Sequence, residues 1–92
     1  MSASTAPSAR RIAVRYFASI REALGTGSET VSTAAATVGA LRDELIARGG
    51  AHAAALDRAR PVRIAVDQVM SPESQPLADG AEVAFFPPVT GG

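Results

Sequence analysis

One amphipathic segment, with alternating segments on both sides of it, constrains the fold of this 92-residue chain more than any other feature. The segment is "TVGALRDELIARGG", residues 37–50. Its apolar side chains recur at the spacing of one helix face: Val38, Leu41, Leu45 and Ile46. A threonine that can cap the first turn precedes them, and two glycines that can end the helix follow. The sequence therefore predicts one main helix here.

The polar residues of this helix and the residues after it lead to two smaller predictions. Glu44 and Arg48 have i, i+4 spacing, which favours an ion pair on the exposed face of the helix. The stretch "HAAALDRA", residues 52–59, predicts a short additional helical segment.

Alternation of apolar and polar residues predicts strands before and after the main helix. Two strands precede it and are joined by a short helical turn that glycines close, in "RIAVRYFA" (11–18), "SIREALGTG" (19–27) and "SETVS" (28–32). Two more strands follow it, in "PVRIAVD" (61–67) and "AEVAFF" (81–86), with a short strand near Val69 between them.

The order of these elements defines the fold class. Two strands, one packed helix and further strands form an α+β pattern, and the helical connection is long enough for a crossover between parallel strands. We expect a ubiquitin-like β-grasp domain over residues 11–86, with a mixed sheet of about five strands over one main helix. Residues 1–10 form a disordered N-terminal extension, and residues 87–92 form an extended, flexible C-terminal tail.

Composition excludes several classes of partner. Nine acidic residues balance nine basic ones, which gives no electrostatic reason to expect nucleic acid or a membrane surface as a partner.

The sequence also bears on the cellular compartment. There is no cysteine, so the chain suits a reducing compartment. No stretch approaches the roughly 20 apolar residues that span a bilayer, and the N-terminus lacks the apolar run of a signal peptide. We expect a cytoplasmic protein.

The usual catalytic and cofactor-binding patterns are missing from the sequence. His52 has no metal-ligand spacing around it, and we interpret it as a packed or solvated structural histidine. Asp43 and Glu44 are adjacent on the helix, so their side chains diverge. Residues 25–27, "GTG", lack the lysine and the longer glycine spacing of a phosphate-binding loop. We expect no cofactor or metal bound by this chain and no self-contained active site.

The four aromatic residues form two adjacent pairs, Tyr16-Phe17 and Phe85-Phe86. Neighbours in a strand point to opposite faces. The alternation places Tyr16 and Phe85 in the core, and leaves Phe17 and Phe86 on the outside. If the first and last strands are neighbours, these two rings form one apolar patch of the kind that marks partner sites, unless loops cover them.

The last eight residues, "FFPPVTGG", are the most distinctive motif of the chain. Pro87 and Pro88 favour a stiff, extended exit from the sheet, which Val89 and Thr90 continue. Gly91 and Gly92 have no side chain, so they can pass through a narrow tunnel and bring an unhindered carboxylate to another enzyme's active site. A functionless terminus or a cloning remnant would explain a Gly-Gly pair, but not the whole octet.

This octet follows "ADGAEVA" and resembles the C-terminus of the MoaD/ThiS family of ubiquitin-like sulfur carriers. The resemblance is to the MoaD-type members of the family, which are the small subunits of molybdopterin synthase. The segments "IAVRYFASIREALGTG", "TVGALRDEL" and "RIAVDQ" are similar to that family as well. The resemblance covers residues 11–92. At Asp67 the family pattern has Asn, which affects only a local turn contact, and the N-terminal extension is longer than usual.

The resemblance implies a mechanism and a set of partners. An E1-like adenylating enzyme would use ATP to convert the Gly92 carboxylate to an acyl-adenylate, and a sulfur donor protein would convert that to a thiocarboxylate. Gly92 would then donate sulfur to cyclic pyranopterin monophosphate, twice per molybdopterin, with Gly91 as its slim neighbour. The large synthase subunit would supply the main catalytic residues, in a heterotetramer of two small and two large subunits. The partner-binding residues implied are Phe86, Phe17, Pro87, Pro88, Val89 and Thr90.

Other functions remain open at the level of sequence. A sulfur carrier for thiazole or cysteine synthesis would use the same tail chemistry, a ubiquitin-like modifier would join Gly92 to target lysines, and a plain interaction module would not use the tail. All nine basic residues are arginine. Either composition is biased, or the absence of lysine prevents an activated Gly92 from acylating its own chain.

Overall fold

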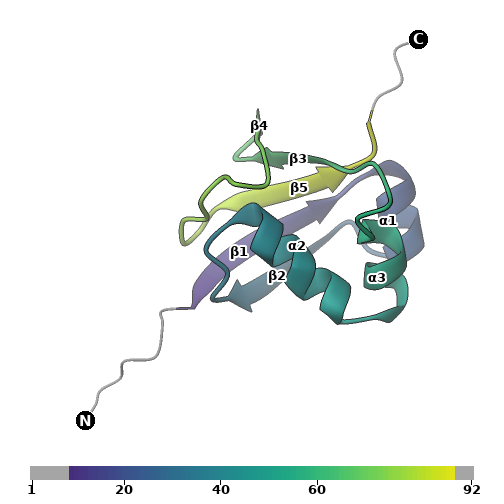
Figure 1. Cartoon of the computed structure of the whole chain (residues 1–92), viewed down its shortest axis with the longest axis horizontal. Coiled ribbons are helices and arrows are strands. Elements are labelled where there is room, and N and C mark those ends of the chain that lie inside the picture. The colour runs from purple at the N-terminus through teal and green to yellow at the C-terminus, as the bar shows by residue number, and fades with distance from the viewer. Residues whose placement is uncertain (1–8, 89–92) are drawn as a thin grey trace.

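The computed structural model describes residues 9–88 and contains one mixed five-stranded sheet (Figure 1). The order of the strands in the sheet is β2-β1-β5-β3-β4. Their bounds are β1 Arg10–Tyr16, β2 Ser28–Thr33, β3 Arg63–Val66, β4 Val69–Met70 and β5 Glu82–Phe86. β1 pairs with β5 in parallel, and the other three pairings are antiparallel. The first and last strands are therefore neighbours at the centre of the sheet.

Three helices cover one side of this sheet. The longest, α2 (Val38–Ala47), crosses the sheet face, whereas α1 (Ala18–Leu24) and α3 (Gly50–Leu56) lie together near the end of the sheet where β5 stops (Figure 1). This arrangement confirms the predicted β-grasp fold, with one main helix and two short helical segments. None of the helices within residues 9–88 has the length and apolar character needed to cross a membrane.

The ends of α2 are set by the residues that the sequence indicated. The Thr37 side chain accepts a hydrogen bond from the Ala40 backbone N–H at 3.2 Å, which satisfies one of the free donors of the first turn. After the helix, Gly49 has a φ of 76°, a conformation that glycine adopts without steric cost. The chain turns there into α3.

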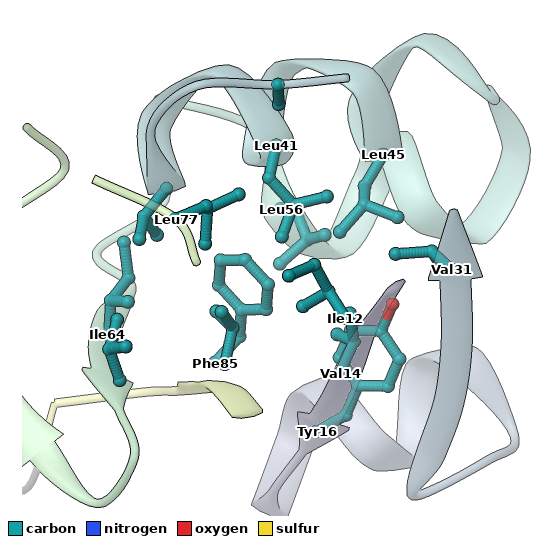
Figure 2. Packing of buried hydrophobic residues seen from close by; sticks show 14 of the residues in the cluster. Ile12, Val14, Tyr16, Val31, Leu41, Leu45, Leu56, Ile64, Leu77 and Phe85 are labelled. Carbon is teal, nitrogen blue, oxygen red and sulfur yellow. The ribbon is translucent and has the colours of Figure 1, made fainter. Parts of the chain in front are cut away.

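The core lies between α2 and the central strands. Ile12, Val14 and Tyr16 of β1 alternate inward and are almost fully buried, as are Val83 and Phe85 of β5. Figure 2 shows the Phe85 ring at the centre of this cluster, below the helix leucines. The other large, fully buried side chains come from the helices: Val38, Leu41, Leu45 and Leu56. The apolar residues that alternate along the strands and those that recur at helical spacing thus pack together in one core.

A buried arginine joins α2 to two distant segments. The Arg42 side chain donates hydrogen bonds to the backbone carbonyls of Leu56 and Asp57, each at 2.9 Å, and forms an ion pair with Glu73 at 2.8 Å. Arg42 is only 4% exposed. Burying a charge is costly unless every donor is satisfied, and these acceptors offset that cost. The sequence pattern did not predict this contact, because its acceptors come from outside the helix.

The predicted Glu44–Arg48 ion pair was wrong. Glu44 instead accepts a hydrogen bond from the Thr33 hydroxyl, and Arg48 pairs with Glu29 at 2.7 Å. Both partners belong to β2, which lies beside this side of the helix. An exposed i, i+4 pair contributes only a few tenths of a kcal/mol, so tertiary partners easily replace it.

Candidate functional site

The C-terminal tail leaves the sheet at the end of its central strand, β5, and we call residues 86–88 the tail root. β5 is hydrogen-bonded to β1 on one side and to β3 on the other. It ends at Phe86, Pro87 and Pro88 follow, and all three residues are half-buried. Four predicted functional residues lie outside the described part of the chain: Val89, Thr90, Gly91 and Gly92. What the structure describes is therefore the surface from which the tail begins.

Both aromatic pairs divide between the core and the surface as predicted. Tyr16 and Phe85 are buried and stacked, with ring centroids 6.2 Å apart at an interplanar angle of 19°. On the opposite face, Phe17 and Phe86 meet edge to face at 6.5 Å and 84°. Phe17 is 42% exposed and Phe86 is half-buried, so the loops do not cover them.

The pairing of the strands places three more side chains on the same face of the sheet as these two rings. Ala65 lies opposite Ala84 on β5 and opposite Met70 on β4. Paired residues share a face, so these three side chains continue the surface of Phe17 and Phe86. We call these five residues the outer patch. Met70 is 54% exposed.

A hollow of about 320 Å³ lies within the outer patch. The small side chains of Ala65 and Ala84 line it together with Phe17 and Phe86. Arg15 borders it, placed 5.9 Å from the Phe17 ring centroid and 3.1 Å from the Glu82 carboxylate. An apolar floor with a charged rim is typical of protein interfaces. The sequence did not identify Ala65, Ala84 or Met70, because cross-strand register is not visible in a linear pattern.

Asp67, where the resemblance implies an asparagine, lies in the β3–β4 turn. Asp67 and Gln68 have φ values of 49° and 71°, the two positive values of a tight hairpin turn. The Asp67 carboxylate accepts a hydrogen bond from the Glu82 backbone N–H at 3.0 Å. Asn carries an equivalent acceptor oxygen, so the substitution preserves the contact.

One polar cluster that the sequence did not predict lies between the sheet and the helices. The Glu29 carboxylate accepts a hydrogen bond from the Tyr16 hydroxyl at 2.7 Å, pairs with Arg48 at 2.7 Å and contacts His52 at 2.9 Å. Burial opposes ionisation of Glu29, but the hydrogen bonds from His52, Arg48 and Tyr16 outweigh it and lower the pKa to about 2. Burial and the hydrogen bond to Glu29 raise the pKa of Tyr16.

This cluster joins β1 and β2 to α3 and to the end of α2. Its carboxylate stays ionised, its tyrosine stays protonated, and His52 also packs edge to face against Tyr16. The interpretation of His52 as a packed structural residue agrees with this placement. Residues 9–88 contain no group of three or more His, Asp or Glu side chains arranged to hold a metal ion.

Comparison with known proteins identifies the family. The model of the ThiS family matches residues 14–92. The chain is 44% identical over 81 residues to the molybdopterin synthase sulfur carrier subunit of Escherichia coli (strain K12), covering 88% of this chain and 99% of that protein. It is 39% identical over 84 residues to the protein of the same name from Mycobacterium tuberculosis, covering 89% and 98%.

Solved structures share the fold over nearly their whole length. A putative molybdopterin converting factor subunit 1 from Pyrococcus furiosus has a TM-score of 0.72 at 29% identity, covering 87% of this chain and 99% of that one. The small archaeal modifier protein 1 of Haloferax volcanii has a TM-score of 0.71 at 26% identity, with the same coverage. A chain in the complex of molybdopterin-converting factor subunits 1 and 2 from Helicobacter pylori 26695 shares the fold at 24% identity, with a TM-score of 0.61 and coverage of 89% and 99%.

The match to the family model spans most of the chain, and both curated relatives agree with it over nearly all of their length. The matched residues include most of the five-stranded sheet. They also include both aromatic pairs, one buried and one on the surface. This chain belongs to the ThiS family.

Proposed function

We propose that this chain is the sulfur carrier subunit of a molybdopterin synthase and that Gly92 carries the sulfur. The observation that carries the proposal is the setting of the tail root. Pro87 and Pro88 directly follow Phe86, a residue of the outer patch, at the end of the central strand β5. A partner that docks on the patch is thus in position to receive residues 89–92. The names of the relatives from Escherichia coli and Mycobacterium tuberculosis agree with this role.

The reaction uses the terminal carboxylate of Gly92. A carboxylate oxygen attacks the α-phosphorus of ATP on an E1-like enzyme, which releases pyrophosphate and forms an acyl-adenylate. The terminal sulfur of a persulfide on the sulfur donor then attacks the activated carbonyl and AMP leaves, which gives an acyl disulfide. A thiol cleaves the S–S bond of this acyl disulfide, so the products are the thiocarboxylate and a disulfide. The thiocarboxylate transfers sulfur to cyclic pyranopterin monophosphate, and the carboxylate is regenerated with an oxygen from water. Two such cycles supply the two sulfur atoms of molybdopterin.

The chain contributes a reactive terminus and a docking surface to this scheme, and the enzymes contribute the catalytic groups. Because Gly91 and Gly92 lack side chains, they hinder neither passage through a narrow tunnel nor attack on the carbonyl. The outer patch binds the large subunit in a heterotetramer of two small and two large subunits, with Phe86 as the central anchor. Aromatic anchors of this kind commonly dominate the binding energy of an interface.

The test follows the mass of the intact chain. The chain is incubated with the adenylating enzyme, ATP and a sulfur source, and replacement of one oxygen by sulfur at Gly92 is expected. A variant that lacks Gly91 and Gly92 is the matched control and should remain unchanged. Addition of the large subunit and pyranopterin should then yield molybdopterin and return the wild-type chain to its original mass. Failure of the wild-type chain to gain sulfur contradicts the proposal.

A second candidate function is protein modification. The likeness to small archaeal modifier protein 1 favours it, because the two domains share a fold over nearly their whole length. A modifier would form an isopeptide bond between Gly92 and a lysine of another protein. The same incubation, with lysine-containing acceptor proteins added, distinguishes the two: conjugates indicate a modifier, whereas a thiocarboxylate that is consumed by the large subunit indicates a synthase subunit. A thiocarboxylate consumed only in thiazole or cysteine synthesis indicates those pathways.

A further inference from the structure

A groove of about 270 Å³ lies on the helix side of the tail root, away from the outer patch. It is bounded by α1, by α3, by the segment before β3 and by Pro87 and Pro88. Figure 1 shows α1 and α3 close to the end of β5, where the chain leaves the sheet. The groove is open because the helices present small side chains to it, among them Ala23 and Ala54.

One charged side chain lines the groove. Arg60 is exposed, and within residues 9–88 its guanidinium forms no ion pair. Its backbone is held in place, because its N–H donates to the Asp57 carbonyl at 2.8 Å and its carbonyl accepts from Arg42 at 3.3 Å. A cation on a fixed backbone therefore stands at the edge of an apolar groove. This combination suits an apolar segment that carries a carboxylate.

Two apolar surfaces, each with an arginine at its edge, thus flank the same tail root. The outer patch lies on the open face of the sheet, and the groove lies on the helix face. Pro87 and Pro88 line the groove and lead directly into residues 89–92. An enzyme that encloses those residues must bring its own chain close to the two prolines, so the groove is continuous with the surface that receives the tail.

We infer that the groove is a second docking surface, which takes an apolar loop bearing an acidic side chain from an enzyme that receives the tail. The inference rests on the proposed function, because it assumes that the tail is received by an enzyme. The acidic side chain pairs with Arg60, and the apolar part of the loop packs between α1 and α3.

The experiment measures binding of the full chain to the adenylating enzyme and, separately, to the large subunit. Arg60→Glu reverses the charge at the groove, and Ala54→Trp fills it. Arg11→Glu makes the same charge change at the opposite end of β1 and is the matched control. Circular dichroism and thermal unfolding of each variant establish that it is folded. Because Arg60→Glu changes only the side chain, the backbone N–H and carbonyl of residue 60 can still form their hydrogen bonds to Asp57 and Arg42.

We expect both groove variants to lower the affinity for at least one of the two enzymes by about tenfold or more, with Arg11→Glu close to wild type. Arg60→Glu should also slow association and make it less sensitive to salt than wild type if the partner loop is acidic. Wild-type affinity of both groove variants for both enzymes overturns the inference. That result differs from a failure of the proposed function, in which the wild-type chain itself neither binds these enzymes nor gains sulfur.

Discussion

The rings of Phe17 and Phe86 meet edge to face, with centroids 6.5 Å apart, although the two residues lie 69 positions apart in the chain. The parallel pairing of β1 and β5 brings them together, because each ring lies at or just beyond the end of its strand. Edge-to-face aromatic pairs contribute about 0.5–1.5 kcal/mol beyond the area they bury. A double-mutant cycle with Phe17→Ala and Phe86→Ala should find a coupling energy of that size in urea unfolding. Additive effects of the two substitutions would contradict the contact.

The outer patch should bind the large subunit through Met70 as well as through the aromatic rings. Met70→Glu places a charge in the apolar surface, so the affinity for the large subunit should fall at least about tenfold. Val69→Glu is the control, because Val69 is the neighbouring residue of the same short strand, is 64% exposed, and points to the other face. Isothermal titration calorimetry measures both. Equal losses for the two variants would show that the patch does not extend to β4 in the way the register implies.

Acid should destabilise the domain through Glu29. Its pKa is about 2 in the folded chain and 4.5 for the ordinary group, so its contribution is fully present above pH 4.5 and is lost as the pH falls toward 2. The full contribution is roughly 3 kcal/mol. Urea unfolding of wild type and Glu29→Gln across this range isolates it. The free energy difference between the two proteins should shrink as the pH falls, and a constant difference would contradict the assignment.

Arg42 should contribute far more to stability than its neighbour Arg58. Arg42→Met leaves the Leu56 and Asp57 carbonyls without their donor, and an unsatisfied buried acceptor costs about 1–3 kcal/mol. The Arg58 side chain is 45% exposed in its pairs with Asp43 and Glu73, so Arg58→Met should cost less than about 1 kcal/mol. Chemical denaturation of both variants compares them, and similar losses would mean that Arg42 does not join the three segments as described.

Asp67→Asn should leave the domain intact. The amide oxygen can accept the hydrogen bond from the Glu82 N–H, and Asn tolerates the positive φ of this turn. We expect a change in unfolding free energy within about 0.5 kcal/mol, typical of a conservative surface substitution. Asp67→Ala removes the acceptor and provides the comparison, with a larger loss expected in thermal unfolding.

Much of this fold could be predicted from local pattern. The alternation of β1 and β5 correctly assigned Tyr16 and Phe85 to the core, and the spacing of α2 identified the face that carries Leu41 and Leu45. What could not be predicted depends on register and on contacts distant in sequence. The pairing of Ala65 with Met70 and Ala84, and the hydrogen bonds of Arg42, are set by how the elements assemble. The Glu44–Arg48 prediction failed for the same reason, because local spacing does not reveal that β2 offers better partners.

The parallel pairing of β1 with β5 also determines how the domain bears mechanical load. A pull on residues 89–92 acts along β5, whose hydrogen bonds to β1 and β3 run across the direction of the pull. Those bonds are loaded in shear, so several must break together before the strand can slide. The domain can therefore resist a pull on its C-terminal end without peeling apart, and β1 begins with Arg10 at the opposite end of the sheet from the end of β5.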